Sequence, residues 1–297
     1  MIMKKITISL FACFSLFLHA QYNIDEISFT TMSINDGLLS NETTCFLQDD
    51  IGFIWVGTTN GLCRYDGYEF KAYKSNYLNP KYFLGNSIKC LAKDTRSRLW
   101  IGTTIGINVL DLKTGLIDQY ALEDLGCSVI NTIALSHDNI PYIGTEIGVL
   151  RLNEETKVVE NIKSDSRGVP IKGNYIQTLY VDRQNVLWIG TWHTGFSALD
   201  LNKNIFYQYP DIVEDNKLSI TSIFEDNEGC IWLSSWNEIG LIRLENPYGK
   251  TPKTTTYPIR YKEQSSSIPS VFGAFQDHKN RYVWIATSDG LKVLTDI

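Results

Sequence analysis

Short runs of alternating apolar and polar residues, separated by Asp, Asn and Gly, follow one another along most of this chain. In the first unit the alternation predicts four strands, over Glu42–Gln48, Phe53–Thr58, Leu62–Gly67 and Glu69–Tyr73. The residues between the strands suit tight turns, because an Asp side chain accepts backbone N–H bonds and glycine takes a positive φ. The unit therefore predicts one small antiparallel sheet.

The same unit occurs six times. Each copy centres on an aromatic residue, at steps of 45, 42, 46, 44 and 52 residues: Trp55-Val56-Gly57-Thr58, Trp100-Ile101-Gly102-Thr103, Tyr142-Ile143-Gly144-Thr145, Trp188-Ile189-Gly190-Thr191, Trp232-Leu233-Ser234-Ser235 and Trp284-Ile285-Ala286-Thr287. An Asp precedes each aromatic residue: Asp49, Asp94, Asp138, Asp182, Asp226 and Asp277. A Gly follows each: Gly61, Gly106, Gly148, Gly195, Gly240 and Gly290. A period of roughly 40–50 residues built from short strands is typical of a β-propeller with one four-stranded blade per repeat. We predict an all-β propeller of six blades.

The repeated aromatic residues are interpreted as core anchors between blades. An indole removes roughly 150–250 Å² from water when it is buried, and all six aromatic residues share one register in the middle of a strand. The repeated Asp and Gly residues are interpreted as turn chemistry.

The ends of the chain leave two ways to close the ring. Ile27–Ile34 is predicted as a strand with no blade of its own, and the sixth repeat stops one strand short of four. Pairing the first strand with the last blade would complete that blade and remove two exposed sheet edges. The alternative is that the chain is part of a seven-bladed propeller in a larger protein.

The N-terminus predicts export. Two lysines precede an apolar run from Ile6 to Leu18 and a small residue, Ala20, so residues 1–20 resemble a secretory signal peptide and residues 21–297 are assigned to the propeller. The apolar run is shorter than the about 20 residues that a membrane span needs. A lipid-anchored Cys13 is a second interpretation of the same segment.

Charge and rare residues exclude several classes of function. The chain carries 33 acidic and 27 basic residues and has no basic stripe, which argues against nucleic acid as a partner. Beyond the leader there are five cysteines without metal-ligand spacing, interpreted as buried free thiols, and three scattered histidines. The chain has neither a phosphate-binding loop nor a serine-nucleophile motif, and we expect no cofactor, metal or catalytic group.

One rim of the predicted ring carries candidate ligand-binding residues. At the fourth position after the anchor, where other repeats have Thr, Glu or Ser, two consecutive repeats place Trp192 and Trp236. Both of these turns are also lengthened, and His193, Asn237 and Glu238 adjoin the tryptophans. Indoles with polar neighbours can stack on sugar rings and bind hydroxyl groups. The alternatives are that these tryptophans cap the core or contact a second propeller.

The repeats also resemble a known family. Asp-Gly-Leu-Leu-Ser-Asn over 36–41 and Asp-x-x-Gly-Phe-Ile-Trp-Val-Gly-Thr-x-x-Gly-Leu-x-Arg-Tyr-Asp-Gly over 49–67 resemble the two-component regulator propeller repeat. Tyr142 in the third repeat and Ser234-Ser235 in the fifth depart from that pattern. The resemblance implies the leading part of the periplasmic sensor of a Bacteroidetes hybrid two-component histidine kinase. It further implies an oligosaccharide ligand, a second propeller or other downstream sensor domains as partners, a homodimer in the full sensor, tethering to the inner membrane and a phosphorelay.

Three classes of function therefore compete. The first is a non-catalytic sensor that binds an oligosaccharide and biases the conformation of its partner domains. The second is a propeller enzyme acting on glycans, a lyase or a hydrolase, for which Glu146, His193 and Glu238 are the rim candidates. The third is a scaffold for protein–protein contacts.

Overall fold

The computed structural model describes residues 28–75, 83–209, 218–236, 239–259, 269–277 and 282–295. It divides the chain into residues 1–30 and a compact unit of residues 31–297, which contains all the sheets. The predicted signal peptide, residues 1–20, lies outside the described residues. Among the residues that are described, no helix has the length and apolar character to cross a membrane.

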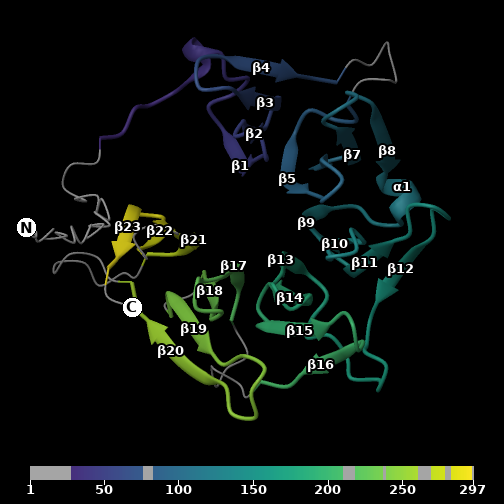
Figure 1. Ribbon diagram of the computed structural model, residues 1–297, viewed down its shortest axis with the longest axis vertical. Coiled ribbons are helices and arrows are strands. Elements are labelled where there is room, and N and C mark those ends of the chain that lie inside the picture. Colours follow the sequence, from purple (N-terminus) through teal and green to yellow (C-terminus); the bar gives the residue numbers. More distant parts are fainter. Residues whose placement is uncertain are drawn as a thin grey trace, which may run out of the picture. The chain divides into compact units, whose positions relative to one another are not determined.

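Six antiparallel sheets, one for each repeat, are arranged in a ring (Figure 1). Blade 1 contains β1 (Thr43–Gln48), β2 (Ile54–Thr58), β3 (Gly61–Tyr65) and β4 (Phe70–Tyr73). Blade 2 contains β5 (Ile88–Lys93), β6 (Arg98–Thr103), β7 (Gly106–Asp111) and β8 (Ile117–Ala121), and the one-turn helix α1 (Leu122–Leu125) follows. Blade 3 contains β9 (Ile130–Leu135), β10 (Pro141–Thr145), β11 (Gly148–Leu152) and β12 (Val159–Ile162).

The second half of the ring repeats this order. Blade 4 contains β13 (Ile176–Val181), β14 (Val186–Thr191), β15 (Phe196–Asp200) and β16 (Ile205–Tyr207). Blade 5 contains β17 (Ile220–Glu225), β18 (Ile231–Ser235), β19 (Leu241–Glu245) and β20 (Lys253–Tyr257). Blade 6 has three strands in the described residues, β21 (Val271–Gln276), β22 (Val283–Thr287) and β23 (Gly290–Leu294). The predicted all-β, six-bladed propeller is confirmed.

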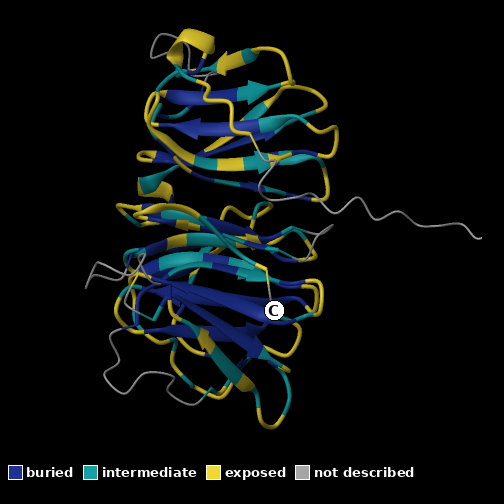
Figure 2. Cartoon of the chain, turned by 90° about the vertical axis from the view of Figure 1, so that its left-hand side faces the viewer, coloured by how far each residue is buried: buried dark blue, intermediate teal, exposed yellow. Residues whose placement is uncertain are grey.

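The core lies between the blades. Five hydrophobic clusters each join two consecutive blades, and the innermost strands pack in sequence, β1 on β5, β5 on β9, β9 on β13, β13 on β17 and β17 on β21. Figure 2 shows this packing as buried strands with exposed connections at their ends. Five of the predicted anchors are at most 5% exposed: Trp55, Trp100, Tyr142, Trp188 and Trp232. The sixth, Trp284, is half-buried.

The repeated Asp is more than a turn residue. In blade 1, Asp49 Oδ1 accepts the backbone N–H groups of Ile51, Gly52 and Phe53, each at 3.0 Å, and its Oδ2 accepts the indole Nε1–H of Trp55 at 2.9 Å. The same indole bond recurs in blades 2, 4 and 5, at 3.3, 2.6 and 2.8 Å: Trp100 to Asp94, Trp188 to Asp182 and Trp232 to Asp226. One carboxylate thus closes the turn and satisfies the polar atom of the buried anchor.

In blade 3 Asp138 lies in the turn, as predicted, but it is exposed and does not hold the place that Asp49 holds in blade 1. That place belongs to Ser136, whose amide donates to Ile140 O and whose Oγ accepts the Ile140 amide, both at 3.0 Å. Tyr142 replaces the anchor tryptophan in this blade, so no indole N–H calls for a carboxylate. The two departures from the repeat therefore belong together.

The glycine of the repeated motif is required by the approach of the next blade. A Cβ on Gly190 would lie 2.6 Å from Thr178 Cγ2 and 2.7 Å from Ile220 Cγ2 of blade 5. Gly57, Gly102 and Gly144 meet an isoleucine of the following blade in the same way. In blade 5 a serine occupies this position, and the next inner strand begins with Val271, a smaller residue than isoleucine.

The predicted N-terminal strand, Ile27–Ile34, is wrong over its described part. Residues 28–33 form no strand, and Ile34–Asp36 is a turn of 3-10 helix; Ile27 lies outside the described residues. Ser33 caps this turn, since its Oγ accepts the Asn35 amide at 3.2 Å while its own amide donates to Asp36 Oδ2 at 2.8 Å. These local bonds compete with sheet pairing.

The described cysteines are all free thiols, as expected. Three of them are buried, Cys63, Cys90 and Cys230, and the other two are half-buried. Burial raises the pKa of Cys230 to about 11, which keeps it in the unreactive thiol form at neutral pH.

Candidate functional site

The turns between the second and third strands meet the beginnings of the innermost strands at one end of the ring. In five blades the amide of the fourth residue after the anchor donates to the carbonyl of the residue that precedes the inner strand, at 3.0–3.1 Å: Thr59 to Glu42, Thr104 to Ser87, Trp192 to Tyr175, Trp236 to Ser219 and Ser288 to Ser270. These turn residues therefore share one rim.

Each inner strand carries a bulge next to this rim. The pairing register shifts after the first residue of β1, β5, β9, β13, β17 and β21. A bulge re-aims the extra side chain out of the regular alternation. The bulge residues are Thr44, Lys89, Asn131, Gln177, Thr221 and Phe272. The sixth is the only aromatic one in this set.

The structure brings Trp192 and Trp236 into contact, with ring centroids 5.9 Å apart and planes inclined by 55°. Trp236 also contacts Phe272, at 5.4 Å, and Trp192 contacts the His193 ring, at 5.0 Å. These four residues, the rim aromatic cluster, extend across blades 4, 5 and 6. Trp236 is 42% exposed and Phe272 is 47% exposed, so their rings face solvent rather than the core.

The position of His193 is fixed by blade 5. Its backbone takes φ 67°, its amide donates to Ser219 Oγ at 3.0 Å, and its Nδ1 lies 3.3 Å from the same hydroxyl oxygen. The side chain is nevertheless exposed. Asn237 and Glu238, predicted beside Trp236, lie outside the described residues.

Other rim residues named from the sequence serve the backbone. The Glu146 carboxylate accepts the amides of Ser128 at 2.6 Å and Val129 at 3.0 Å. Burial raises the pKa of Glu146, but these amides outweigh burial and hold it below the usual range. Two asparagines that precede the inner strands of blades 1 and 2, Asn41 and Asn86, also accept backbone amides, from Ile34 and Ser75. Glu146 and His193 are engaged by different partners, and no shared catalytic arrangement of the two is present in the described residues.

One group of side chains has the spacing of a metal site, formed by Asp226, Glu228 and Cys230 in blade 5. The Arg243 guanidinium already lies beside both carboxylates, 3.4 Å from Asp226 and 2.8 Å from Glu228. Asp226 also holds the turn and the indole of Trp232. The group is explained by the blade architecture.

Phe272 is the functional candidate that sequence reasoning missed. It contributes an exposed ring to the rim from a third blade. The sequence could have identified Phe272, because it is aromatic at the second position of an inner strand, where the other repeats have Thr, Lys, Asn, Gln and Thr.

The two component regulator propeller model matches residues 37–60, 82–104, 170–193 and 209–237, so the chain carries repeats of this family. The chain is 36% identical over 70 residues to Histidine kinase P4 of Formosa agariphila, a match that spans 24% of this chain and 5% of that kinase.

Solved structures share the fold. The extracellular domain of the hybrid two component system BT3049 from B. thetaiotaomicron matches with a TM-score of 0.60 and 21% identity, over 89% of this chain and 41% of that one. Virginiamycin B lyase from Staphylococcus aureus, solved with quinupristin, matches with a TM-score of 0.62 and 16% identity, over 86% of this chain and 80% of the lyase. The chain thus spans less than half the length of the sensor domain.

Proposed function

We propose that this chain, with its two component regulator propeller repeats, is the leading ligand-binding part of an extracytoplasmic sensor that recognises an oligosaccharide. The repeats and the fold shared with the extracellular domain of a hybrid two component system support the sensor role. On this proposal residues 1–20 direct export to the periplasm, and residues 21–297 form the sensing propeller. Further sensor domains, a homodimer and a membrane-tethered histidine kinase then pass the signal into a phosphorelay.

The observation that carries the ligand site is the rim aromatic cluster. Trp192, Trp236 and Phe272 hold three neighbouring rings partly open to solvent at one end of the ring. Core packing does not require them, because each blade already has a fully buried anchor four residues earlier in the chain, Trp188 in blade 4 and Trp232 in blade 5. Aromatic faces beside hydrogen-bonding groups suit the apolar face and hydroxyl groups of a sugar. His193, and from the sequence Asn237 and Glu238, supply the polar groups.

Ligand binding at this rim has a direct route to a conformational response. The cluster joins blades 4, 5 and 6, and a ligand that contacts all three favours one relative arrangement of the blades. A ligand shifts a conformational equilibrium only as far as it binds one state better than the other. Contacts that span several blades provide such a difference.

Calorimetric titration of the intact sensor with plant, host and yeast oligosaccharides tests the site. Losing two stacking contacts of about 1 kcal/mol each weakens binding by roughly tenfold or more, so the double variant Trp192→Ala/Trp236→Ala should lose at least that much affinity. The matched control is Thr59→Ala/Thr104→Ala, which changes the same register in blades 1 and 2 and should bind normally. Equal affinity of the tryptophan variant and the parent protein would place the site elsewhere.

A lyase or hydrolase activity is the second candidate, and the fold shared with virginiamycin B lyase is the observation that favours it. Incubating the chain with the oligosaccharide that binds, and following new reducing ends or unsaturated products by mass spectrometry, distinguishes the two. The sensor proposal predicts an unchanged ligand. Turnover that is lost in His193→Ala would support the enzyme.

A further inference from the structure

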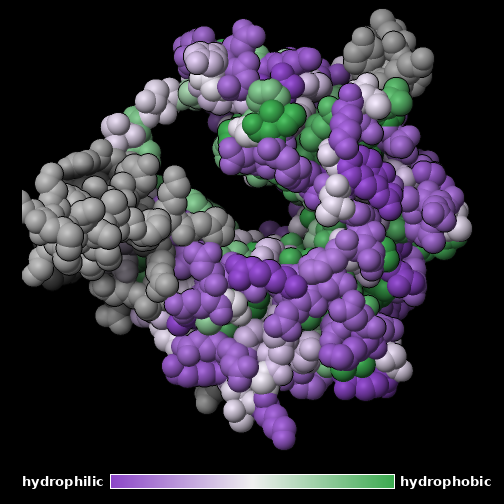
Figure 3. All heavy atoms as spheres, viewed as in Figure 1, coloured by the Kyte–Doolittle hydropathy of each residue, from purple (hydrophilic) through white to green (hydrophobic). Residues whose placement is uncertain are grey.

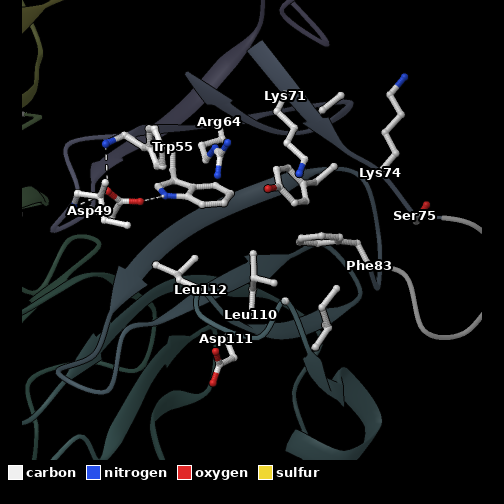
Figure 4. Close-up of a pocket in the computed structure, with 16 residues that line it drawn as sticks. Asp49, Trp55, Arg64, Lys71, Lys74, Ser75, Phe83, Leu110, Asp111 and Leu112 are labelled. Atoms are coloured by element: carbon white, nitrogen blue, oxygen red, sulfur yellow. Dashed lines mark hydrogen bonds between the residues drawn. The ribbon is translucent and has the colours of Figure 1, made fainter. Parts of the chain in front are cut away.

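A cavity within the described residues lies away from the rim, between blades 1 and 2. Its volume is ≈ 920 Å³, which is within the usual size of small-molecule sites. Blade 1 contributes Trp55, Arg64, Lys71 and Tyr73, and Phe83 stands opposite them with the turn and strands at the outer edge of blade 2. Figure 4 shows these side chains facing one another across the opening.

Arg64 is unusual among three arginines that occupy the same place in their blades. Arg64, Arg151 and Arg243 each pair across the sheet with the anchor residue, in blades 1, 3 and 5. Arg151 forms an ion pair with Glu160, and Arg243 forms ion pairs with Asp226 and Glu228.

No ion pair holds Arg64 within the part of the chain that the structure describes. Its guanidinium lies 4.1 Å from the centroid of the Phe53 ring, and its Nε is buried without a hydrogen-bond partner there. A buried donor without a partner costs about 1–3 kcal/mol, so this atom indicates a site for an acceptor.

Lys71 is the second cation of the cavity. Its Nζ lies 5.5 Å from the centroid of the Tyr73 ring, and the described residues place no carboxylate within ion-pair distance of it. In Figure 4 the Lys74 side chain, by contrast, extends away from the cavity. Both inward cations therefore rest on aromatic faces, which attract a cation more weakly than a carboxylate does.

The carboxylates near the cavity are committed elsewhere. Asp49 binds the Trp55 indole and three backbone amides of its turn. Asp111 accepts the amides of Lys113 and Thr114 and points away from the opening in Figure 4. Asp66, two residues after Arg64, accepts the amides of Tyr68 and Glu69. These carboxylates are thus engaged by donors of their own turns, whereas Arg64 and Lys71 have no carboxylate partner within the described residues.

We propose that this cavity binds an organic oxyanion, a carboxylate or a sulfate carried on a ring. The guanidinium of Arg64 and the ammonium of Lys71 bind the oxygen atoms, since charge-assisted bonds to such groups are the strongest available to these side chains. The ring of the ligand packs against the wall formed by Tyr73 and Phe83, whose rings contact each other edge to face at 5.9 Å. This site is separate from the rim aromatic cluster and does not depend on its role.

An NMR titration that follows the seven tryptophan indole N–H signals of the chain tests the proposal. The probes are phenyl sulfate and benzoate, which distinguish the two oxyanions, and the neutral benzyl alcohol. The Trp55 signal should shift and saturate with at least one anion, while the Trp192 and Trp236 signals stay in place. Arg64→Gln should weaken binding by about tenfold or more, as expected for a charge-assisted bond. Arg151→Gln, which changes the same register in blade 3, should leave binding unchanged.

If Arg64→Gln does not fold, Lys71→Gln on the outermost strand of blade 1 takes its place as the test. This variant should weaken binding of the anion severalfold. The proposal is overturned if benzyl alcohol binds as tightly as the anions, or if neither anion shifts the Trp55 signal. It is equally overturned if the folded Arg64→Gln protein binds like the parent.

Discussion

Blades 4 and 6 carry almost the same motif and differ in what it contacts. Trp188-Ile189-Gly190-Thr191 in blade 4 is buried throughout, and the Trp188 ring packs against Tyr209 and against Tyr248 of blade 5. Trp284-Ile285-Ala286-Thr287 in blade 6 forms the same strand, but Trp284 is half-buried. Phe275, which pairs with Trp284 across the sheet, is 59% exposed, and Leu291 is 52% exposed.

The difference separates two properties of the repeat, the formation of the strand and the burial of its anchor. The motif determines a strand that pairs on both sides, with a bulge in the inner strand, and both blades share this arrangement. Burial of the anchor depends on the following blade, because each anchor faces forward along the ring: Trp232 packs against Val271 and Ile285 of blade 6. Within the described residues, Trp284 belongs to no hydrophobic cluster of this kind, in line with its partial exposure.

The largest expected effect is on the anchors themselves. Trp188→Ala should lower the free energy of unfolding by about 3–5 kcal/mol, the usual cost of deleting a large core aromatic residue. Trp284→Ala should cost less than this, because part of the Trp284 side chain is already exposed to solvent. Urea denaturation followed by circular dichroism measures both. Equal losses would show that the forward face of blade 6 is covered in solution.

The glycine of the motif should show the same contrast on a smaller scale. Gly190→Ala should destabilise the protein by about 1–3 kcal/mol, the range for overpacking a core, because the new Cβ meets Thr178 and Ile220. The matched change in blade 6, Ala286→Val, should be nearly neutral because Ala286 is exposed. A thermal-denaturation midpoint that falls equally in both variants would contradict this.

The sequence predicts the local features of the blades better than the contacts between them. Period, turn chemistry and alternation are local, and they predicted six blades, buried anchors at Trp55 and Trp100, and the shared rim of Trp192 and Trp236. The bond from Asp182 to the Trp188 indole was missed, since turn chemistry alone accounts for an Asp at that position. In blade 3 the residue equivalent to Asp49 is Ser136 rather than Asp138, since Ser136 lies six residues before the anchor, as Asp49 does in blade 1.

Three other features of the structure could not be predicted from the spacing of residues in the repeats. Ile27–Ile34 has the composition of a strand, but Ser33 and Asp36 bind the local backbone and make a 3-10 turn. The contact of Phe272 with Trp236 depends on a bulge in the inner strand. Arg64 differs from Arg151 and Arg243 because it forms no ion pair within the described residues, whereas the other two do. Neither a bulge nor a missing partner leaves a spacing signal.

A double-mutant cycle measures the coupling between the turn residue Ser136 and the anchor Tyr142 in blade 3. Ser136→Asp alone should destabilise by about 1–3 kcal/mol because it buries a carboxylate without an indole donor. Adding Tyr142→Trp supplies that donor and should recover about 1 kcal/mol relative to the sum of the single changes. Denaturant titration of the four proteins gives the coupling. Simple additivity would mean that the carboxylate and the indole act independently.

The smallest effect is a pH dependence from Asp165, which lies in the connection between blades 3 and 4. Burial would raise the pKa of Asp165, but the Phe206 amide, the Arg167 guanidinium and the Val169 amide outweigh it and hold the pKa well below 3.8. Its contribution is therefore present at neutral pH and is lost as the pH falls below 3.8 through the depressed pKa. Asp165→Asn should lower the melting temperature at neutral pH, and the gap to the parent should narrow in acid. A constant gap would contradict this assignment.

The central claim, that the rim aromatic cluster holds the ligand, is tested most directly by the indole N–H signals of the tryptophans in the intact sensor during titration with the oligosaccharide that binds. The account predicts that the Trp192 and Trp236 signals shift with the binding curve, while those of the buried Trp188 and Trp232 in the same two blades stay in place. Saturating oligosaccharide that leaves Trp192 and Trp236 unshifted would contradict it.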